Sequence, residues 1–256
     1  MDISELNREV YKSDQVVAYY KQKQELYAPE KAIFQLLQDQ LSHWRMLDMG
    51  VGAGRTTHYF GPRVKEYWGM DYAPVMIAAC QQLFPQYHFW VADAKAMPEI
   101  ENEYFDLVLF SFNGLDCCGQ EDRLQILTEI RRILKQKGYF CFSSHNLQGV
   151  SDLFSWRFSW NPFLFWRRWR HCLRLRRLNA AFLNQSQATD YAIINDGSHD
   201  YQSWHYYIRP QAQIRQLIAY GFGNIRLFAV DGRELTSPEA VAAETGYMIY
   251  YLCQKS

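Results

Sequence analysis

The stretch from Trp44 to Arg55, WRMLDMGVGAGR, constrains the fold more than any other part of the chain. A short apolar run ends at Asp48 and predicts a buried strand. Three glycines follow at alternate positions, Gly50, Gly52 and Gly54. They predict a turn with backbone conformations that bulkier residues rarely adopt. A strand, a glycine-rich turn and the start of a helix together form a surface for a nucleotide-type ligand. The alternative is a plain tight turn without a ligand.

The composition is compatible with one large α/β domain that carries an insertion. Of the 256 residues, 48% are apolar, which is enough for a sizeable core. Lysine plus arginine and aspartate plus glutamate each number 27, so a nucleic acid or an anionic membrane could be attracted only by a local patch. A polar N-terminus and the absence of an apolar run of about 18 residues predict a cytoplasmic protein. The cysteines contain no Cys-x-x-Cys pair, so we expect neither a metal site nor disulfides.

Strands and helices alternate beyond the glycine turn. Apolar runs predict four more strands, VKEYWGMD, YHFWVAD, FDLVLFSFN and YFCFSS, and two late ones, NIRLFAV and GYMIYYLCQ. Helical spacing is present in PVMIAACQQLF, in DRLQILTEIRRILKQKG and from Pro210 to Tyr220. Residues 2 to 42 predict two further helices. The alternation predicts a doubly wound, mostly parallel, seven-stranded α/β sheet.

The glycine spacing distinguishes two kinds of cofactor. In the dinucleotide-binding fingerprint a third glycine would stand at position 55, which is Arg55 here. The run Asp-x-Gly-x-Gly-x-Gly instead resembles the first motif of the class I S-adenosylmethionine-dependent methyltransferases. Acids at later strand positions, Asp71, Asp93 and Asp106, match the same family. The resemblance implies the Rossmann-like methyltransferase fold, with the last strand antiparallel.

The same resemblance implies S-adenosyl-L-methionine as the cofactor. Asp71 would accept hydrogen bonds from the ribose hydroxyls, although a helix-capping role is its alternative. In the family, the acid at Asp93 accepts from the adenine amino group and Ala94 offers its backbone N–H. A helix that begins at Arg55 would favour the methionine carboxylate. The expected cofactor contacts are Asp48, Gly50, Gly52, Gly54, Asp71, Met76, Asp93, Ala94 and Phe110.

We divide the chain into four parts: cap helices in 1–43, the cofactor-binding core in 44–146, a lid or substrate insertion in 147–204, and the rest of the sheet in 205–256. Three tyrosines of the first part are expected to pack in the core or to touch the cofactor: Tyr19, Tyr20 and Tyr27.

The insertion is unusually basic and aromatic. Between 147 and 180 there are seven arginines and one acid, Asp152. On a helix one side would carry Phe165, Trp166, Trp169 and Cys172, and another Arg167, Arg170, Arg174 and Arg177. The helix could pack its aromatic side on the sheet, or its basic side could bind an anionic or membrane-associated substrate. A nucleic-acid partner is not expected, because the Asp/Asn-Pro-Pro-Tyr motif and a Pro-Cys nucleophile are both missing.

Candidate acid–base residues come from two segments. His145 follows the fifth strand at the sheet edge where ligands bind, and SHDYQSWHYYIRP returns from the insertion towards that edge. Methyl transfer depends mainly on alignment, and a base is needed only if the acceptor carries a proton. We expect His145 to be that base and His205 to be the second candidate. A loop-capping bond for His145 and packing in a strand for His205 are the alternatives. The expected substrate contacts are Asn113, Asn146, Trp156, His199, Asp200, Tyr206 and Tyr207.

These features predict methyl transfer to a nitrogen or oxygen of a small-molecule metabolite. The second hypothesis is a methyltransferase for a lipid or quinone, with peripheral membrane contact through the basic aromatic insertion. The third is a cofactor-binding interaction protein without activity. The sequence does not identify the acceptor, the number of methyl groups transferred, the oligomeric state or the pathway.

Overall fold

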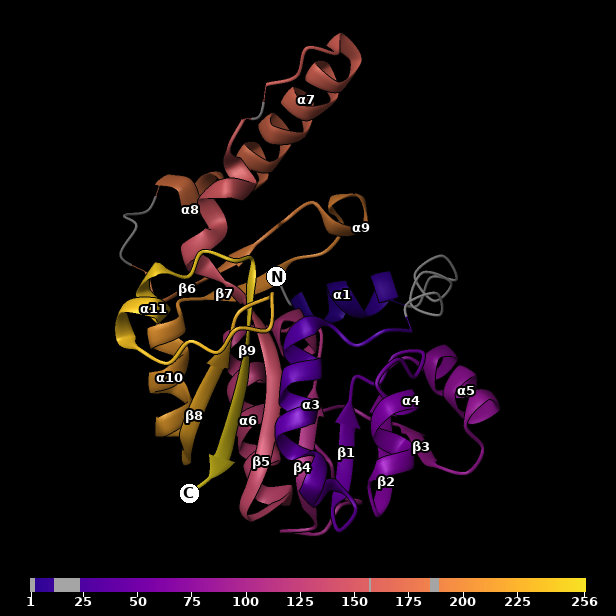
Figure 1. Cartoon of the computed structure of the whole chain (residues 1–256). Helices are drawn as coiled ribbons and strands as arrows, with labels where there is room; N and C mark the ends of the chain where they lie inside the picture. Colours follow the sequence, from indigo (N-terminus) through magenta and orange to yellow (C-terminus); the bar gives the residue numbers. More distant parts are fainter. Residues whose placement is uncertain (1–2, 12–23, 157, 185–188) are drawn as a thin grey trace.

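The computed structural model describes residues 3–11, 24–156, 158–184 and 189–256 (Figure 1). Tyr19 and Tyr20, candidates for a cofactor contact, lie outside these residues. The strands are β1 (Arg45–Met49), β2 (Glu66–Asp71), β3 (His88–Val91), β4 (Phe105–Phe110), β5 (Leu134–Asn146), β6 (Tyr191–Ile194), β7 (His205–Ile208), β8 (Phe222–Phe228) and β9 (Met248–Lys255).

Helices connect the strands and precede them. The α-helices are α1 (Ile3–Tyr11), α3 (Ala28–Leu41), α4 (Thr57–Phe60), α5 (Pro74–Leu83), α6 (Gln120–Ile133), α7 (Pro162–Leu178), α8 (Ala180–Asn184), α9 (Ser198–Tyr201), α10 (Pro210–Ala219) and α11 (Pro238–Ala243). Short 3-10 helices are η1 (Gly61–Arg63), η2 (Gly114–Cys117) and η3 (Leu147–Phe154). Within the described residues no helix is long and apolar enough to cross a membrane.

The sheet has the predicted doubly wound arrangement. Strands β3, β2, β1, β4 and β5 are neighbours in that order and parallel. Strand β9 lies antiparallel between β5 and β8, as the resemblance implied. The chain order reverses between β1 and β4, and such a reversal is where open α/β sheets bind ligands beyond the strand ends.

Both faces of the sheet are covered. Met46 and Leu47 are adjacent in β1 and fully buried, but they belong to different core clusters. Successive residues of a strand point to opposite faces, so each face must have its own apolar layer. This is why the strand sequences are almost continuously apolar.

The prediction of seven strands was incomplete. Strands β6 and β7 pair antiparallel, and the end of β7 runs parallel to the end of β5, with His145 opposite Tyr207. His145 also lies opposite Met248 of β9. Strand β7 therefore lies on the edge of β5 opposite to β9. This edge is free near His145, because the pairing of β4 with β5 ends at Phe142. The segment predicted as a lid thus contributes β6, and β7 follows it into the sheet.

Candidate active site

The glycine turn forms the floor of a cavity beyond the end of β1. All three glycines have positive φ, at 60°, 55° and 83°. A Cβ at Gly50 would overlap Phe110, and one at Gly54 would overlap Phe84. At Gly52, by contrast, an added Cβ would meet nothing within 4 Å. The outer glycines therefore allow close packing, while Gly52 presents bare backbone to open space.

Two buried aspartates hold this turn. Asp48 accepts hydrogen bonds from Thr56 Oγ1 and from Tyr67 Oη, the latter at 2.6 Å. Burial raises the pKa of Asp48 to about 6 despite these bonds. Asp71 accepts from the backbone N–H of Gly52 at 3.0 Å and of Ala73 at 2.9 Å. Burial also raises the pKa of Asp71, against the effect of these bonds.

A helix does follow the turn, but it begins at Thr57 instead of Arg55 and is short. It comprises only Thr57–Phe60 and continues as η1, where Pro62 follows Gly61. A helix of one turn has a small dipole, which weakens the argument for binding the methionine carboxylate there. Arg55 is a cation in the turn itself, and its side chain contacts Glu30 of α3 at 2.5 Å.

The cavity brings together most of the predicted cofactor contacts. Its lining includes Asp48, Gly50, Gly52, Asp71, Met76, Asp93, Ala94 and Phe110. Gly54 is not in the lining because it packs beneath the turn against Phe84. Of the described residues in 147–204, none lines this cavity.

The helix α1 closes one side of the cavity. Ser4, Asn7 and Arg8 are in its lining. Arg8 pairs with Asp93 at 2.7 Å, and the other carboxylate oxygen of Asp93 accepts from the backbone N–H of Lys95 at 3.0 Å. Tyr27 lies outside the lining and stacks on Phe112, with ring centroids 5.1 Å apart. Of the two alternatives predicted for Tyr27, packing or contact with the cofactor, the structure shows packing.

A histidine–aspartate pair lies at the end of β5. Nδ1 of His145 is 2.8 Å from Asp116, and Nε2 is 3.0 Å from the side-chain amide nitrogen of Asn113. The contact with Asp116 is electrostatic, because the ring is out of line for a hydrogen bond. Burial opposes ionisation of Asp116, but Arg123 and His145 outweigh it and lower its pKa. Asp116 is therefore a buried carboxylate that favours a proton on Nδ1 of His145.

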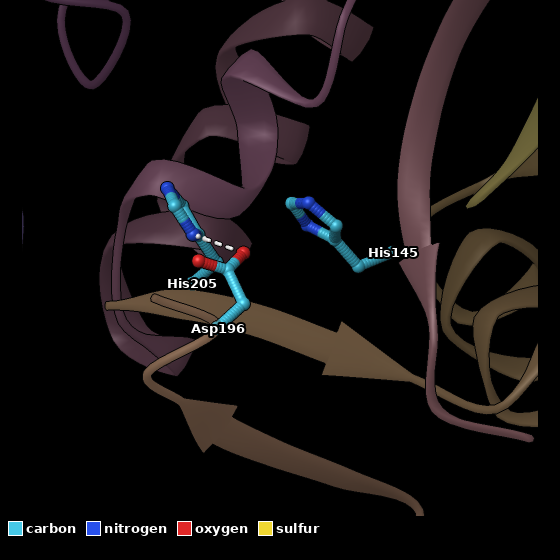
Figure 2. Close-up of side chains that lie close together, drawn as sticks. All are labelled: His145, Asp196 and His205. Atoms are coloured by element: carbon cyan, nitrogen blue, oxygen red, sulfur yellow. Dashed lines mark hydrogen bonds and ion pairs between the residues drawn. The ribbon is translucent and has the colours of Figure 1, made fainter. Parts of the chain in front are cut away.

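A second pair faces the first. Figure 2 shows Asp196 between His205 and His145. Nδ1 of His205 lies 2.9 Å from Asp196, which also accepts a hydrogen bond from Tyr207 at 3.2 Å. Burial tends to lower the pKa of His205, but Asp196 and a hydrogen bond with Cys117 raise it to about 10. The pKa of Asp196 is held well below its usual value, because His205 outweighs the effect of burial. Near neutral pH this pair is an imidazolium and a carboxylate.

The two pairs adjoin the cavity. The imidazole rings of His145 and His205 have centroids 5.2 Å apart, and Tyr207 stacks on His145 at 4.5 Å. Cys117, which hydrogen-bonds His205, is part of the cavity lining. His145, His205 and Tyr207 thus lie beside the part of the cavity that is lined by the segment after β4.

The same cluster offers ligand atoms for a metal ion. Nitrogen and oxygen atoms of His145, Asp196 and His205 lie within 4.8 Å of one another. Cysteine spacing predicted no metal site, but such spacing cannot reveal a set of ligands drawn from three separate segments. Each histidine already has a carboxylate neighbour, Asp116 or Asp196, that favours a proton on the ring nitrogen facing it.

Other predicted substrate residues lie elsewhere. Asn146 caps the start of η3, accepting from the N–H of Gln148 and donating to Glu244. Tyr206 is buried and donates to Gln120. Trp156 is half exposed beside α7. None of these three residues lines the cavity, so their contact with an acceptor stays a prediction.

His199 and Asp200 lie in α9 with left-handed φ of 48° and 55°. Burial and the charge of His205 lower the pKa of His199. Sequence reasoning missed Asp116 and Asp196, the partners of the two catalytic candidates. The only signal was an isolated acid in each turn, GLDCC and INDGS.

Comparisons with known proteins agree with this geometry. A sequence model described as a methyltransferase domain matches residues 46–138. Malonyl-[acyl-carrier protein] O-methyltransferase of Salmonella typhimurium is 29% identical over 99 residues, or 39% of this chain and 38% of that protein.

Solved structures extend the likeness over most of the chain. An S-adenosylmethionine-dependent methyltransferase from Mesorhizobium loti is 13% identical, with a TM-score of 0.62 over 89% of this chain and 98% of its own. A second neighbour is Burkholderia thailandensis 1,6-didemethyltoxoflavin-N1-methyltransferase, which was solved with 1,6-didemethyltoxoflavin and S-adenosylhomocysteine. It is 16% identical, its TM-score is 0.58, and the match covers 98% of this chain and 89% of that chain. At such identities the likeness establishes the fold.

The sheet order and the glycine-floored cavity define a class I methyltransferase fold. The matched segment contains the glycine turn together with Asp48, Asp71 and Asp93. Residues 46–138 form a methyltransferase domain of the class I S-adenosylmethionine-dependent type, and S-adenosylmethionine is its cofactor. The residues present fit this group, because Gly52 leaves open space beside the carboxylate of Asp71.

Proposed function

We propose that this protein transfers a methyl group to an oxygen or nitrogen of a small molecule, at a position that carries a proton before the reaction. The observation that supports this most directly is the meeting of the cofactor cavity with two histidine–aspartate pairs at Cys117. The curated relative is named as an O-methyltransferase and one structural neighbour as an N-methyltransferase.

When bound, S-adenosylmethionine supplies an electrophilic methyl group that a lone pair of the acceptor displaces from sulfur. His145 is the better base of the two histidines. Asp116 favours a proton on Nδ1, so Nε2 is the nitrogen that can accept a further proton from the acceptor. Asn113 is the neighbour of Nε2 in the structure, and an acceptor hydroxyl or amine would replace its amide there.

His205 has a different role. Its pKa of about 10 keeps it protonated near neutral pH, which makes it a poor base and a good cation. Beside His145 it would attract a carboxylate, an enolate or a phenolate of the acceptor. The second catalytic candidate of the sequence analysis is therefore assigned to binding.

The test is a comparison of His145→Ala with His43→Ala, an exposed histidine after α3 that serves as the control. Release of S-adenosylhomocysteine would be followed with a panel of phenols, carboxylic acids and amines. The first variant should retain its cofactor affinity and lose about tenfold or more in turnover. Partial recovery at high pH would support proton removal. Equal turnover of the two variants at all pH values would refute the assignment.

An acceptor that resides in a membrane is the second candidate function. It is favoured by the exposed aromatic side chains around α7. No turnover with any acceptor, together with intact cofactor binding, would instead support an interaction protein.

A further inference from the structure

The helix α7 does not pack its aromatic side on the sheet. It begins at Pro162, where Asn161 accepts hydrogen bonds from the N–H groups of the first turn, and it projects away from the body of the protein (Figure 1). Its buried side chains are Cys172 and Leu175. Leu175 joins a small core cluster with Leu147 and Phe154 of η3. The hypothesis of a lid helix with a covered aromatic side was therefore wrong.

An exposed apolar stripe runs along α7 beside its buried side chains. Trp166, Trp169 and Leu173 are 57%, 39% and 47% exposed. Their spacing of three and four residues places them on one side of the helix. More aromatic rings adjoin the stripe in edge-to-face contacts, and Trp160 is 92% exposed. We call this surface the aromatic arm; its members are Trp156, Phe158, Trp160, Phe163, Trp166, Trp169 and Leu173.

Positive charge surrounds the aromatic arm. The helix contains no aspartate or glutamate. Its exposed arginines are Arg167, Arg168, Arg170, Arg174, Arg176 and Arg177. In the part of the chain that the structure describes, none of these guanidinium groups pairs with a carboxylate. A hollow between α7 and Tyr201 of α9 is lined by several of them. This surface is complementary to an anionic one.

We propose that the aromatic arm docks the protein on an anionic lipid membrane. Tryptophan and phenylalanine beside arginine suit the boundary between headgroups and acyl chains, because each ring can enter the apolar layer while the guanidinium groups stay among phosphates. Exposed Leu173 and Leu178 favour lipid over nucleic acid, since aliphatic side chains gain from hydrocarbon but do not stack on bases.

Docking would also orient the active site. Figure 1 places α7 on the side of the molecule towards which the carboxyl end of β1 points, where α1 closes the cofactor cavity. A docked arm would thus bring this side of the protein towards the membrane. The docking itself rests on α7 alone and does not depend on the proposed methyl transfer.

The experiment is flotation of the full chain with vesicles of phosphatidylcholine, with and without about 30% phosphatidylglycerol. We expect binding to the anionic vesicles, weakening with salt, and a blue shift of tryptophan fluorescence. Trp160→Ser combined with Trp166→Ser should reduce the bound fraction about tenfold or more. Arg167→Gln, Arg170→Gln and Arg174→Gln together should do the same on anionic vesicles.

The matched control combines Leu83→Ser and Ile218→Ser, which replace exposed apolar side chains elsewhere. This double variant should bind vesicles as the wild type does. Every variant should bind S-adenosylhomocysteine normally, which separates failure of docking from failure of the enzyme. Equal binding by the tryptophan variants and the wild type would overturn the proposal. So would tighter binding to a single-stranded oligonucleotide than to vesicles, or a dimer that the tryptophan changes abolish.

Discussion

Replacement of Arg123 by methionine is expected to destabilise the protein strongly. Its side chain is fully buried and donates to Asp116 at 2.6 Å, to the carbonyl of Leu115 at 3.1 Å and to Gln213 at 2.5 Å. Methionine fills similar space but leaves the carboxylate of Asp116 without its cation. Removal of one partner from a buried ion pair typically costs about 3–5 kcal/mol. We expect the free energy of unfolding of Arg123→Met to be lower than that of the wild type by about this amount.

The loss should depend on pH. In the wild type the pKa of Asp116 is lowered, so its ionised form stabilises the fold above the unfolded pKa of about 4. Without Arg123, burial would raise this pKa, and the folded protein would then prefer a protonated Asp116. The loss should therefore be large near pH 8 and smaller near pH 5, where the carboxyl group can accept a proton.

Urea unfolding of both proteins at the two pH values measures this effect. Arg131→Met, at an exposed position in the same helix, is the control and should unfold almost as the wild type does. Adding Asp116→Asn to Arg123→Met should restore part of the stability, because no charge then remains buried. A loss below about 1 kcal/mol, or an equal loss at both pH values, would refute the reasoning.

Two further predictions concern the His205–Asp196 pair and the glycine turn. Asp196→Asn should lower the pKa of His205 from about 10, because the carboxylate beside Nδ1 is the main group that raises this pKa against the effect of burial. NMR titration of the imidazole measures the pKa, and an unchanged value would contradict this prediction. In the wild type the raised pKa stabilises the fold fully below about pH 6.5, and this contribution should disappear as pH rises through about 10. Gly54→Ala should cost about 1–3 kcal/mol in thermal unfolding, because its Cβ would lie 2.6 Å from Phe84; unchanged stability would mean that this contact is easily relieved.

Apolar runs were sufficient to predict β1 to β5, because buried parallel strands have nearly continuous apolar sequences. They also predicted the antiparallel strands β8 and β9. The pairing of β6 with β7 was missed because both strands are only four residues long and β6 has no neighbour other than β7 among the described strands of the sheet. Replacing the whole of 147–204, the natural test of a lid, would therefore also remove a strand and Asp196.

Side-chain partners were harder to predict than strands. Asp116 and His145 are 29 positions apart, and only the packing of η2 against β5 brings them together. Helical spacing placed Trp166 and Trp169 on one side of α7 together with Cys172, but Cys172 is buried and the two tryptophans are exposed. It could not reveal which side would face solvent, since that depends on where η3 directs the helix.

The most direct test of the account is calorimetric titration with S-adenosylhomocysteine. The wild type should bind at one site and should not bind a nicotinamide dinucleotide. Asp71→Asn should weaken binding about tenfold or more, because a buried hydroxyl of the ligand would lose a charged acceptor. Gly52→Ala should do the same by placing a methyl group in the open space above the turn. Wild-type affinity in both variants would contradict the placement of the cofactor in this cavity.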